Sequence, residues 1–232
     1  MSAPTLSAGR PAHGAAAHPD SSMDAPVEDL AAVVLCGGES RRMGALGDKA
    51  LLEVGGRTLL ERAVDVLREL RPDVALACGP EPRYEDLGLE LALDPVDGAG
   101  PLAGLVAALE LADRRGATWL AVLACDMPRA DAALLRRLHA RAAERDLDAC
   151  LFETADGLEP LYAVYRTTCL APARRALEAG GRRLVSFHGA DGLAIGTLRE
   201  DALEARGTAR NVNRPDDLGD LGDLDGREER RP

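Results

Sequence analysis

The sequence predicts an α/β protein in which a doubly wound, mostly parallel sheet lies between two layers of helices. Short apolar runs alternate with amphipathic stretches through most of the chain, as expected when a helix follows each strand and packs back on the sheet. Of the 232 residues, 46% are hydrophobic but only 3% are aromatic. A core of Ala, Val and Leu is typical of a buried parallel sheet, and this length suits one α/β domain.

The first half of the chain supplies three expected strands and one helix. Each strand is a short apolar run, and the third ends at Asp94, which a proline follows. Thr58 stands before the amphipathic stretch, where its hydroxyl can accept a hydrogen bond from the first turn of a helix. We expect strands at 30–35, 74–78 and 89–93 and a helix at 58–70.

The second half continues the pattern with two helices and three strands. Pro101 suits the first turn of one helix, and Asp131 suits the N-cap of the other. The run at 161–165 alternates between apolar and other positions, which predicts an antiparallel or an edge strand. We expect helices at 101–115 and 131–144 and strands at 119–125, 148–152 and 161–165.

The two ends of the chain lack such patterns. Residues 1–28 are rich in Ala, Pro, Ser, Gly and His, and we expect a disordered N-terminal tail without the apolar segment of a signal peptide. Residues 29–218 would form the folded domain. Residues 219–232 would form a flexible C-terminal tail, after a short helical turn that begins near residue 216.

Charge and cysteine content limit the classes of function. A formal net charge of -11 argues against nucleic-acid binding, and no apolar run approaches the length of a membrane span. The five cysteines include no Cys-x-x-Cys pair, and we interpret those in apolar runs as buried hydrophobic residues of a cytoplasmic protein. A catalytic Cys36 is the alternative, because this residue borders a glycine pair, although no histidine lies near it in sequence.

The segment after the first strand has the composition of a phosphate-binding loop. Gly37 and Gly38 allow the backbone to bend close to phosphate oxygens, and Arg41, Arg42 and Lys49 supply positive charge in an acidic chain. The spacing fits neither a Walker A loop nor the dinucleotide fingerprint. An ordinary strand-to-helix turn with solvated cations is the alternative, and we favour the phosphate loop.

Two aspartates follow later strands, at the edge of the sheet where ligands of doubly wound proteins bind. Asp126 offers a hard carboxylate to Mg²⁺, and the alternative is that it caps the next helix, for which Asp131 is better placed. Asp94 can bind a ribose hydroxyl or only start a turn. The opening of the helix at Gly100, Pro101 and Leu102 can present backbone N–H groups to a nucleotide.

Five segments in this order resemble the molybdenum cofactor guanylyltransferases. They are LCGGESRRMG at 35–44, DKALL at 48–52, GPLAG at 100–104, CDMP at 125–128 and NVN at 211–213. EPLYAVY at 159–165, expected near a pterin pocket, and GRRL at 181–184 are similar as well, so the resemblance covers about residues 30–220. It implies a three-layer, Rossmann-like nucleotidyltransferase fold.

The resemblance also implies a reaction and its site. GMP would pass from GTP to molybdopterin or its molybdenum form, with Mg²⁺ as the cofactor and pyrophosphate as the product. Molybdoenzymes and cofactor-handling proteins are further candidate partners, and neither nucleic acid nor membrane is expected. Catalytic roles fall to Arg41, Arg42, Lys49, Asp126, Asn211 and Asn213, with Asp126 as the metal ligand. Binding of the nucleotide falls to Leu35, Cys36, Gly37, Gly38, Lys49, Asp94, Gly100, Pro101, Leu102 and Asp126.

Two other functions stay open at this point. A related nucleotidyltransferase would use CTP or another phosphorylated acceptor. A nucleotide-sensing module would bind without turnover, and Ala77, where a polar contact to the nucleotide is expected by resemblance, is the residue that favours it.

Overall fold

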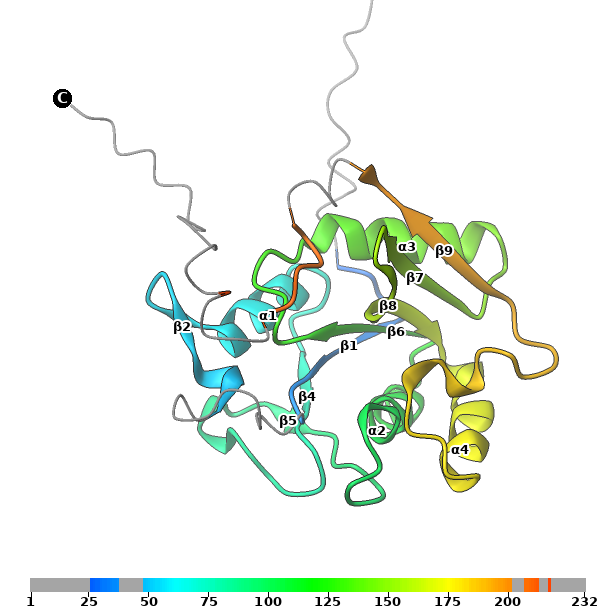
Figure 1. Ribbon diagram of the computed structural model, residues 1–232, viewed down its shortest axis with the longest axis horizontal. Helices are drawn as coiled ribbons and strands as arrows, with labels where there is room; N and C mark the ends of the chain where they lie inside the picture. Colours follow the sequence, from blue (N-terminus) through cyan, green and yellow to red (C-terminus); the bar gives the residue numbers. More distant parts are fainter. Residues whose placement is uncertain (1–25, 38–47, 202–206, 213–216, 218–232) are drawn as a thin grey trace, which may run out of the picture.

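The computed structural model describes residues 26–37, 48–201, 207–212 and 217, and in these residues the strands form one large sheet and one small hairpin (Figure 1). The large sheet has seven strands in the order β5-β4-β1-β6-β8-β7-β9. Their bounds, in that order, are Glu90–Leu91, Ala75–Ala77, Leu30–Leu35, Trp119–Ala124, Gly157–Arg166, Ala149–Thr154 and Ile195–Arg199.

The sheet is mostly parallel, as predicted. Only β8 runs against its neighbours, β6 and β7, whereas every other pair of neighbouring strands in the large sheet is parallel. Of the two alternatives for 161–165, the antiparallel strand is confirmed and the edge strand is not, because β8 lies between two strands and β5 and β9 form the edges. The alternation of apolar and polar residues along a strand shows which face of the sheet is buried, but it does not show whether the strand has one neighbour or two.

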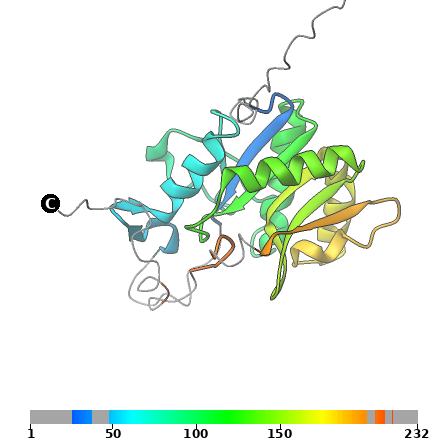
Figure 2. The same ribbon diagram turned by 90° about the horizontal axis from the view of Figure 1, so that it is seen from above.

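Helices cover both faces of this sheet, which confirms the three-layer architecture (Figures 1 and 2). Helices α1 (Leu59–Arg68) and α3 (Ala132–Glu144) pack on one face, and α2 (Pro101–Arg114) and α4 (Leu170–Glu178) pack on the other. Alternate residues of β1 enter the two cores, with Ala32 and Val34 on the first face. Both sides of β1 are buried, which explains its continuous apolar run.

The predicted helix starts are confirmed. The Thr58 hydroxyl accepts a hydrogen bond from the Glu61 N–H at 3.1 Å, and the Glu61 carboxylate accepts one from the Thr58 N–H at 2.8 Å. This capping box typically stabilises a helix by about 1 kcal/mol. The Asp131 carboxylate accepts from the Ala133 N–H at 2.7 Å, and Pro101 is the first residue of α2.

Several elements do not follow from the sequence pattern, because they are short or half exposed. They are the hairpin of β2 (Glu53–Val54) and β3 (Arg57–Thr58), helix α4, strand β9, and the 3₁₀ turns Lys49–Leu51 (η3), Glu85–Leu87 (η4), Thr167–Cys169 (η5) and Leu184–Phe187 (η6). Strand β5 is also shorter than the predicted 89–93. The two tails, and the helical turn expected near residue 216, lie almost wholly outside the described residues.

The cysteines are all free and buried, as the composition predicts. Cys36 packs in the core beneath α1 and α3, and burial raises the pKa of its thiol far above the ordinary value. A buried thiol that stays protonated is a poor nucleophile, which favours the interpretation of Cys36 as a core residue over the catalytic alternative. In the part of the chain that the structure describes, no helix is long and apolar enough to cross a membrane.

Candidate functional site

The carboxyl ends of four neighbouring parallel strands bring the predicted site residues to one edge of the sheet. Leu35 pairs with Ala77 of β4 on one side and with Ala124 of β6 on the other, so the three strands end level with one another. Gly37 follows β1, Asp94 follows β5 and Asp126 follows β6. The chain therefore presents Gly37 and both aspartates on the side where doubly wound proteins bind ligands.

An ion pair joins the two residues that were predicted to handle phosphate and metal. The Lys49 ammonium donates to Asp126 Oδ2 at 2.7 Å, and the side chains are 17% and 23% exposed. Asp126 Oδ1 is buried and has no hydrogen-bond partner among the described residues. Since Asp131 caps α3, the interpretation of Asp126 as a helix cap is wrong, and one of its oxygens is available to a ligand.

A distant segment, 207–212, completes this part of the site. The Val212 N–H donates to the Asp126 backbone oxygen at 2.9 Å, and the Val212 side chain packs on Leu59 of α1. Asn211 is thereby held next to the β6 end, and its Oδ1 is buried without a partner in the described residues. The structure thus brings together Lys49, Asp126 and Asn211, as the resemblance implies.

Asp94 lies on the other side of the β1 end, in a partly buried position. Its N–H donates to the Gly79 oxygen at 2.9 Å, whereas its Oδ1 is buried and has no partner in the described chain. A Cβ on Gly104 of α2 would lie 3.6 Å from that oxygen and 3.4 Å from Leu35 Cδ2. Burial, followed by the charge of Asp97, raises the pKa of Asp94 to about 6. An unpaired buried carboxyl oxygen is costly without a ligand, which favours the ribose contact over a turn alone.

At the start of α2, the backbone N–H groups that were expected to face a nucleotide are partly used in hydrogen bonds within the protein. The Leu102 N–H donates to the Arg182 oxygen at 3.2 Å, and the Ala103 N–H donates to the Gly100 oxygen at 3.0 Å. Gly100 has a φ of 74°, and a Cβ there would lie 3.1 Å from the Arg182 oxygen. The GRRL segment therefore closes this turn, so a nucleotide contact at Gly100, Pro101 and Leu102 stays a prediction and cannot use the Leu102 N–H in this arrangement.

Close packing of the backbone requires a glycine at position 37, which the sequence alone did not indicate. A Cβ at this position would lie 2.6 Å from the Gly79 nitrogen and 3.0 Å from the Cys78 carbonyl carbon. The backbones that leave β1 and β4 therefore approach each other more closely than any other residue type would allow. This close contact sets where the predicted phosphate loop begins.

Other predicted residues have buried side chains or lie outside the described part. The side chain of Cys36 is in the core, so only its backbone can face a nucleotide. Ala77 is 1% exposed and packs beneath α2, so its side chain contributes to the core. Gly38, Arg41, Arg42 and Asn213 lie outside the described residues.

Sequence reasoning missed two polar features of the site. Asp48 is held by the side chains of Arg83 and Tyr84, which follow β4. Glu159 of β8 has a pKa raised to about 7, by burial first and then by the charges of Asp126 and Asp156. The register of β6 and β8 pairs Leu123 with Tyr162, which directs Glu159 toward the Asp126 end. The sequence signal that could have indicated Glu159 is its position in the EPLYAVY segment.

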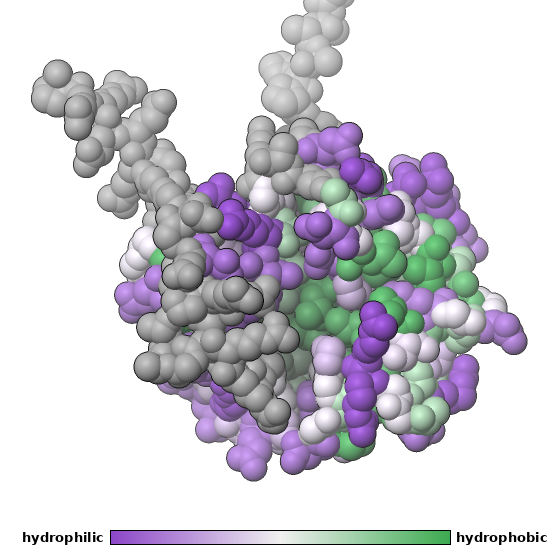
Figure 3. Space-filling view, viewed as in Figure 1, coloured by the Kyte–Doolittle hydropathy of each residue, from purple (hydrophilic) through white to green (hydrophobic). Residues whose placement is uncertain are grey.

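Exposed apolar side chains stand close in sequence to these polar groups. The large hydrophobic residues that are exposed in the described chain adjoin site residues in sequence, and they are Leu51, Leu93, Val96 and Leu158. Figure 3, seen from the same side as Figure 1, shows hydrophobic residues near the middle of this face with hydrophilic residues around them. Among the described residues, no three His, Cys, Asp or Glu side chains are grouped to hold a metal by themselves.

Comparison with known proteins decides the family. The model of the MobA-like NTP transferase domain matches residues 32–192. The chain belongs to this family. The predicted nucleotidyltransferase fold and enzyme class are therefore confirmed, and the matched residues include Lys49, Asp94 and Asp126.

Relatives of this MobA-like chain carry names that agree with the family. A protein of Opitutus terrae named "Probable molybdenum cofactor guanylyltransferase" is 43% identical over 84% of this chain and 96% of its own length. The molybdenum cofactor guanylyltransferase of Rhodopseudomonas palustris strain HaA2 is 35% identical over 85% and 92%. The solved molybdopterin-guanine dinucleotide biosynthesis protein A of Archaeoglobus fulgidus superposes with a TM-score of 0.67 at 27% identity, and covers 82% of this chain and 95% of that one.

Proposed function

We propose that this MobA-like NTP transferase transfers GMP from GTP to the terminal phosphate of molybdopterin or its molybdenum form and releases pyrophosphate. The observation that carries the proposal is the Lys49–Asp126 pair at the carboxyl edge of the sheet, with a buried acceptor oxygen beside it. The names of the relatives give the base and the acceptor class.

The chemistry requires alignment and charge neutralisation and no protein nucleophile. The attacking phosphate oxygen is already anionic, and the leaving group is a stabilised anion. Lys49 leaves Asp126 to bind the β- and γ-phosphates, and Arg41 and Arg42 share that role. The absence of a catalytic thiol follows from this chemistry, in agreement with the buried state of Cys36.

The residues present fit a divalent cation that is shared with the substrate. Mg²⁺ prefers oxygen ligands and usually takes one or two carboxylates together with substrate phosphates. Asp126 meets that description, because its Oδ1 is buried without a partner in the described chain. Asp126 would hold the cation, which would supply Lewis-acid polarisation of the α-phosphate. In the protein without ligands, Lys49 balances the charge of Asp126.

The other site residues divide between the two substrates. Asp94, beside Gly104, would bind the ribose of GTP through its buried carboxyl oxygen. Asn211 and the β8 segment that contains Glu159 would contact the acceptor, with Leu158 as an apolar neighbour in that segment. Molybdoenzymes and cofactor-handling proteins as partners, and a cytoplasmic location, stay predictions.

Pyrophosphate release tests the proposal against its two alternatives. The purified chain is mixed with Mg²⁺, molybdopterin and each nucleoside triphosphate in turn. We expect release with GTP that depends on the acceptor. Release with CTP in place of GTP would favour the cytidylyltransferase alternative. GTP binding without any release would favour the sensing module.

A further inference from the structure

The carboxylate of Asp48 is the centre of a set of contacts that joins two parts of the chain. Asp48 Oδ2 accepts a hydrogen bond from the Tyr84 hydroxyl at 2.7 Å and another from the Arg83 guanidinium. Asp48 Oδ1 accepts from the Ala50 N–H at 3.1 Å. Both oxygens of this carboxylate are therefore occupied, and they connect the β4–β5 segment with the chain that enters η3.

This carboxylate sets the start of the turn from which Lys49 projects. Asp48 is the N-cap of η3, and Lys49 is its first residue. The Leu51 N–H donates to the backbone oxygen of Asp48 at 3.1 Å, and the Leu52 N–H donates to the backbone oxygen of Lys49 at 3.2 Å. Because the backbone on both sides of Lys49 is bonded, the direction of its side chain toward Asp126 depends on the Asp48 cap.

Arg83 and Tyr84 are themselves held in place. The Tyr84 ring packs against the core, and the Arg83 guanidinium lies 4.9 Å from the centre of that ring. Tyr84 has a φ of 61°, a left-handed conformation that is uncommon for an aromatic residue. Residues held in such a conformation often serve a site that the surrounding structure supports.

The electrostatics of Asp48 agree with a permanent anion. Burial by itself would raise the pKa of Asp48, but hydrogen bonds from Tyr84 and Arg83 outweigh burial and lower the pKa below its ordinary value. The carboxylate therefore stays ionised over the neutral range, as a strong acceptor for both donors.

We propose that Arg83 and Tyr84 are positioning residues, which act through Asp48 to aim the Lys49 ammonium at the Asp126 end of the site. The inference rests on the proposed function, in which Lys49 binds the phosphates of GTP. Lysine is a point charge on a flexible stem, so a defined backbone start is needed to place it. The β4–β5 segment thereby gains a role in catalysis without touching the substrate.

A double-mutant cycle tests this chain of contacts. Tyr84→Phe removes one hydroxyl and keeps the ring, and it is made both in the natural chain and in a Lys49→Ala chain. GTP affinity is measured by calorimetric titration with Mg²⁺, and transfer by single-turnover kinetics with molybdopterin. In the natural chain we expect affinity to fall about tenfold, the value of one hydrogen bond to a charged group. In the Lys49→Ala chain the same change should alter affinity by less than about twofold.

Arg83→Gln provides a second cycle, and two variants elsewhere serve as controls. Tyr165→Phe removes a hydroxyl that donates to the Pro160 oxygen at 2.8 Å, and Arg115→Gln removes an arginine that pairs with Glu90. The effect of either control variant on GTP affinity and transfer should be the same with and without Lys49. Thermal melting of every variant identifies changes that act only through folding.

The outcomes separate this inference from the proposed function. If Lys49→Ala by itself leaves GTP affinity and transfer unchanged, the proposed function fails. If Lys49→Ala weakens GTP binding but Tyr84→Phe keeps its full effect in that background, the positioning role is wrong while the proposed function stands. An undiminished effect of Arg83→Gln in the Lys49→Ala chain would make Arg83 a direct ligand of GTP and overturn its positioning role.

Discussion

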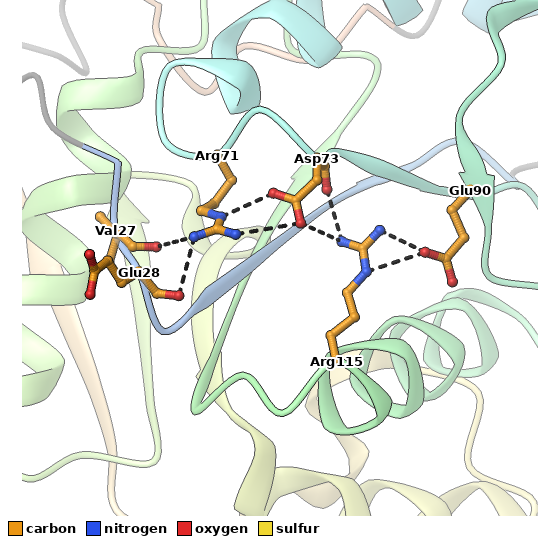
Figure 4. A network of polar contacts seen from close by, with 6 residues as sticks. All are labelled: Val27, Glu28, Arg71, Asp73, Glu90 and Arg115. Atoms are coloured by element: carbon orange, nitrogen blue, oxygen red, sulfur yellow. Dashed lines mark hydrogen bonds and ion pairs between the residues drawn. The ribbon is translucent and has the colours of Figure 1, made fainter.

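Carboxylates are paired differently at the two ends of the parallel strands. At the amino ends, Arg71 and Arg115 bind the carboxylates of Asp73 and Glu90, and Figure 4 shows the two arginines on either side of Asp73. Arg71 also donates to the backbone oxygens of Val27 and Glu28, at 3.3 and 3.2 Å. These contacts tie the starts of β1, β4 and β5 to the end of α2, and the carboxylates of Asp73 and Glu90 each have an arginine partner.

At the carboxyl ends, polar oxygens are buried without such partners. Asp94 Oδ1, Asp126 Oδ1 and Asn211 Oδ1 have no hydrogen bond among the described residues, and Asp126 relies on Lys49 for charge balance. Buried polar groups are usually satisfied, because each unmet hydrogen bond costs about 1 to 3 kcal/mol. Side-chain nitrogens without a partner also occur elsewhere, as at Arg166 Nε, but the three such oxygens in the described residues all lie at this edge. The carboxyl edge therefore keeps acceptor capacity for ligands.

The largest expected effect comes from Asp126→Asn. Loss of the metal-binding carboxylate should lower turnover by about 10²- to 10³-fold, since interactions with the transition-state charge are lost. Melting temperature should change little, because Asp126 serves the site and not the core. Single-turnover kinetics with Mg²⁺ and thermal melting measure the two halves. Normal turnover, or a variant that does not survive purification, would contradict the assignment of Asp126.

Gly37→Ala tests the close backbone approach that starts the phosphate loop. The new Cβ would meet the Gly79 nitrogen at 2.6 Å, so we expect a loss of about 1 to 3 kcal/mol in the free energy of unfolding, together with weaker GTP binding. Gly189→Ala is the matched control, because no atom lies within 4 Å of a Cβ there. Urea unfolding measures the free energy of unfolding of both variants. An equal loss in the two variants would contradict the special role of Gly37.

Asp94→Asn should stabilise the protein in a manner that depends on pH. The folded state raises the pKa of Asp94 from 3.8 to about 6, so ionisation of this carboxyl opposes folding. The penalty is absent below pH 3.8, grows as pH rises from 3.8 to about 6 and is complete above that. With an allowance for solvent screening, we expect a gain of about 1 to 2 kcal/mol at pH 7.5 that shrinks toward pH 4.5. Urea unfolding at both pH values measures it, and a gain that is constant with pH would contradict this explanation.

Asp73→Asn should give the smallest effect and the opposite sign. Burial alone would raise the pKa of Asp73, but hydrogen bonding and the charges of Arg71 and Arg115 lower it. Its ionised form therefore supports folding above the unfolded pKa of 3.8, and this support is lost as pH falls through the lower folded pKa. Because the side chain is 50% exposed, we expect a loss of about 0.5 kcal/mol or less at pH 7.5. Salt should reduce the loss further, and a stabilising effect would break the contrast between the two edges.

Local patterns were sufficient to predict many elements before the structure. The β1 run, the cap at Thr58 and the cap at Asp131 depend on neighbours within a few residues, and the structure has them as expected. The pattern could not show that β8 lies between β6 and β7, since that arrangement joins residues far apart in sequence. Short elements such as β2 and β9 gave too few positions for a periodic signal.

The sequence by itself determined the fold class, the family and the identity of the residues at the strand ends, because hydrophobic periodicity and ordered motifs are local properties. The tertiary structure decided which of these residues meet. Lys49 reaches Asp126 across 77 positions, and Asp48 reaches Tyr84 across 36. It also decided that Cys36 and Ala77 face the cores, because their strands are covered on both sides. Such contacts depend on the order of strands in the sheet, which no local pattern encodes.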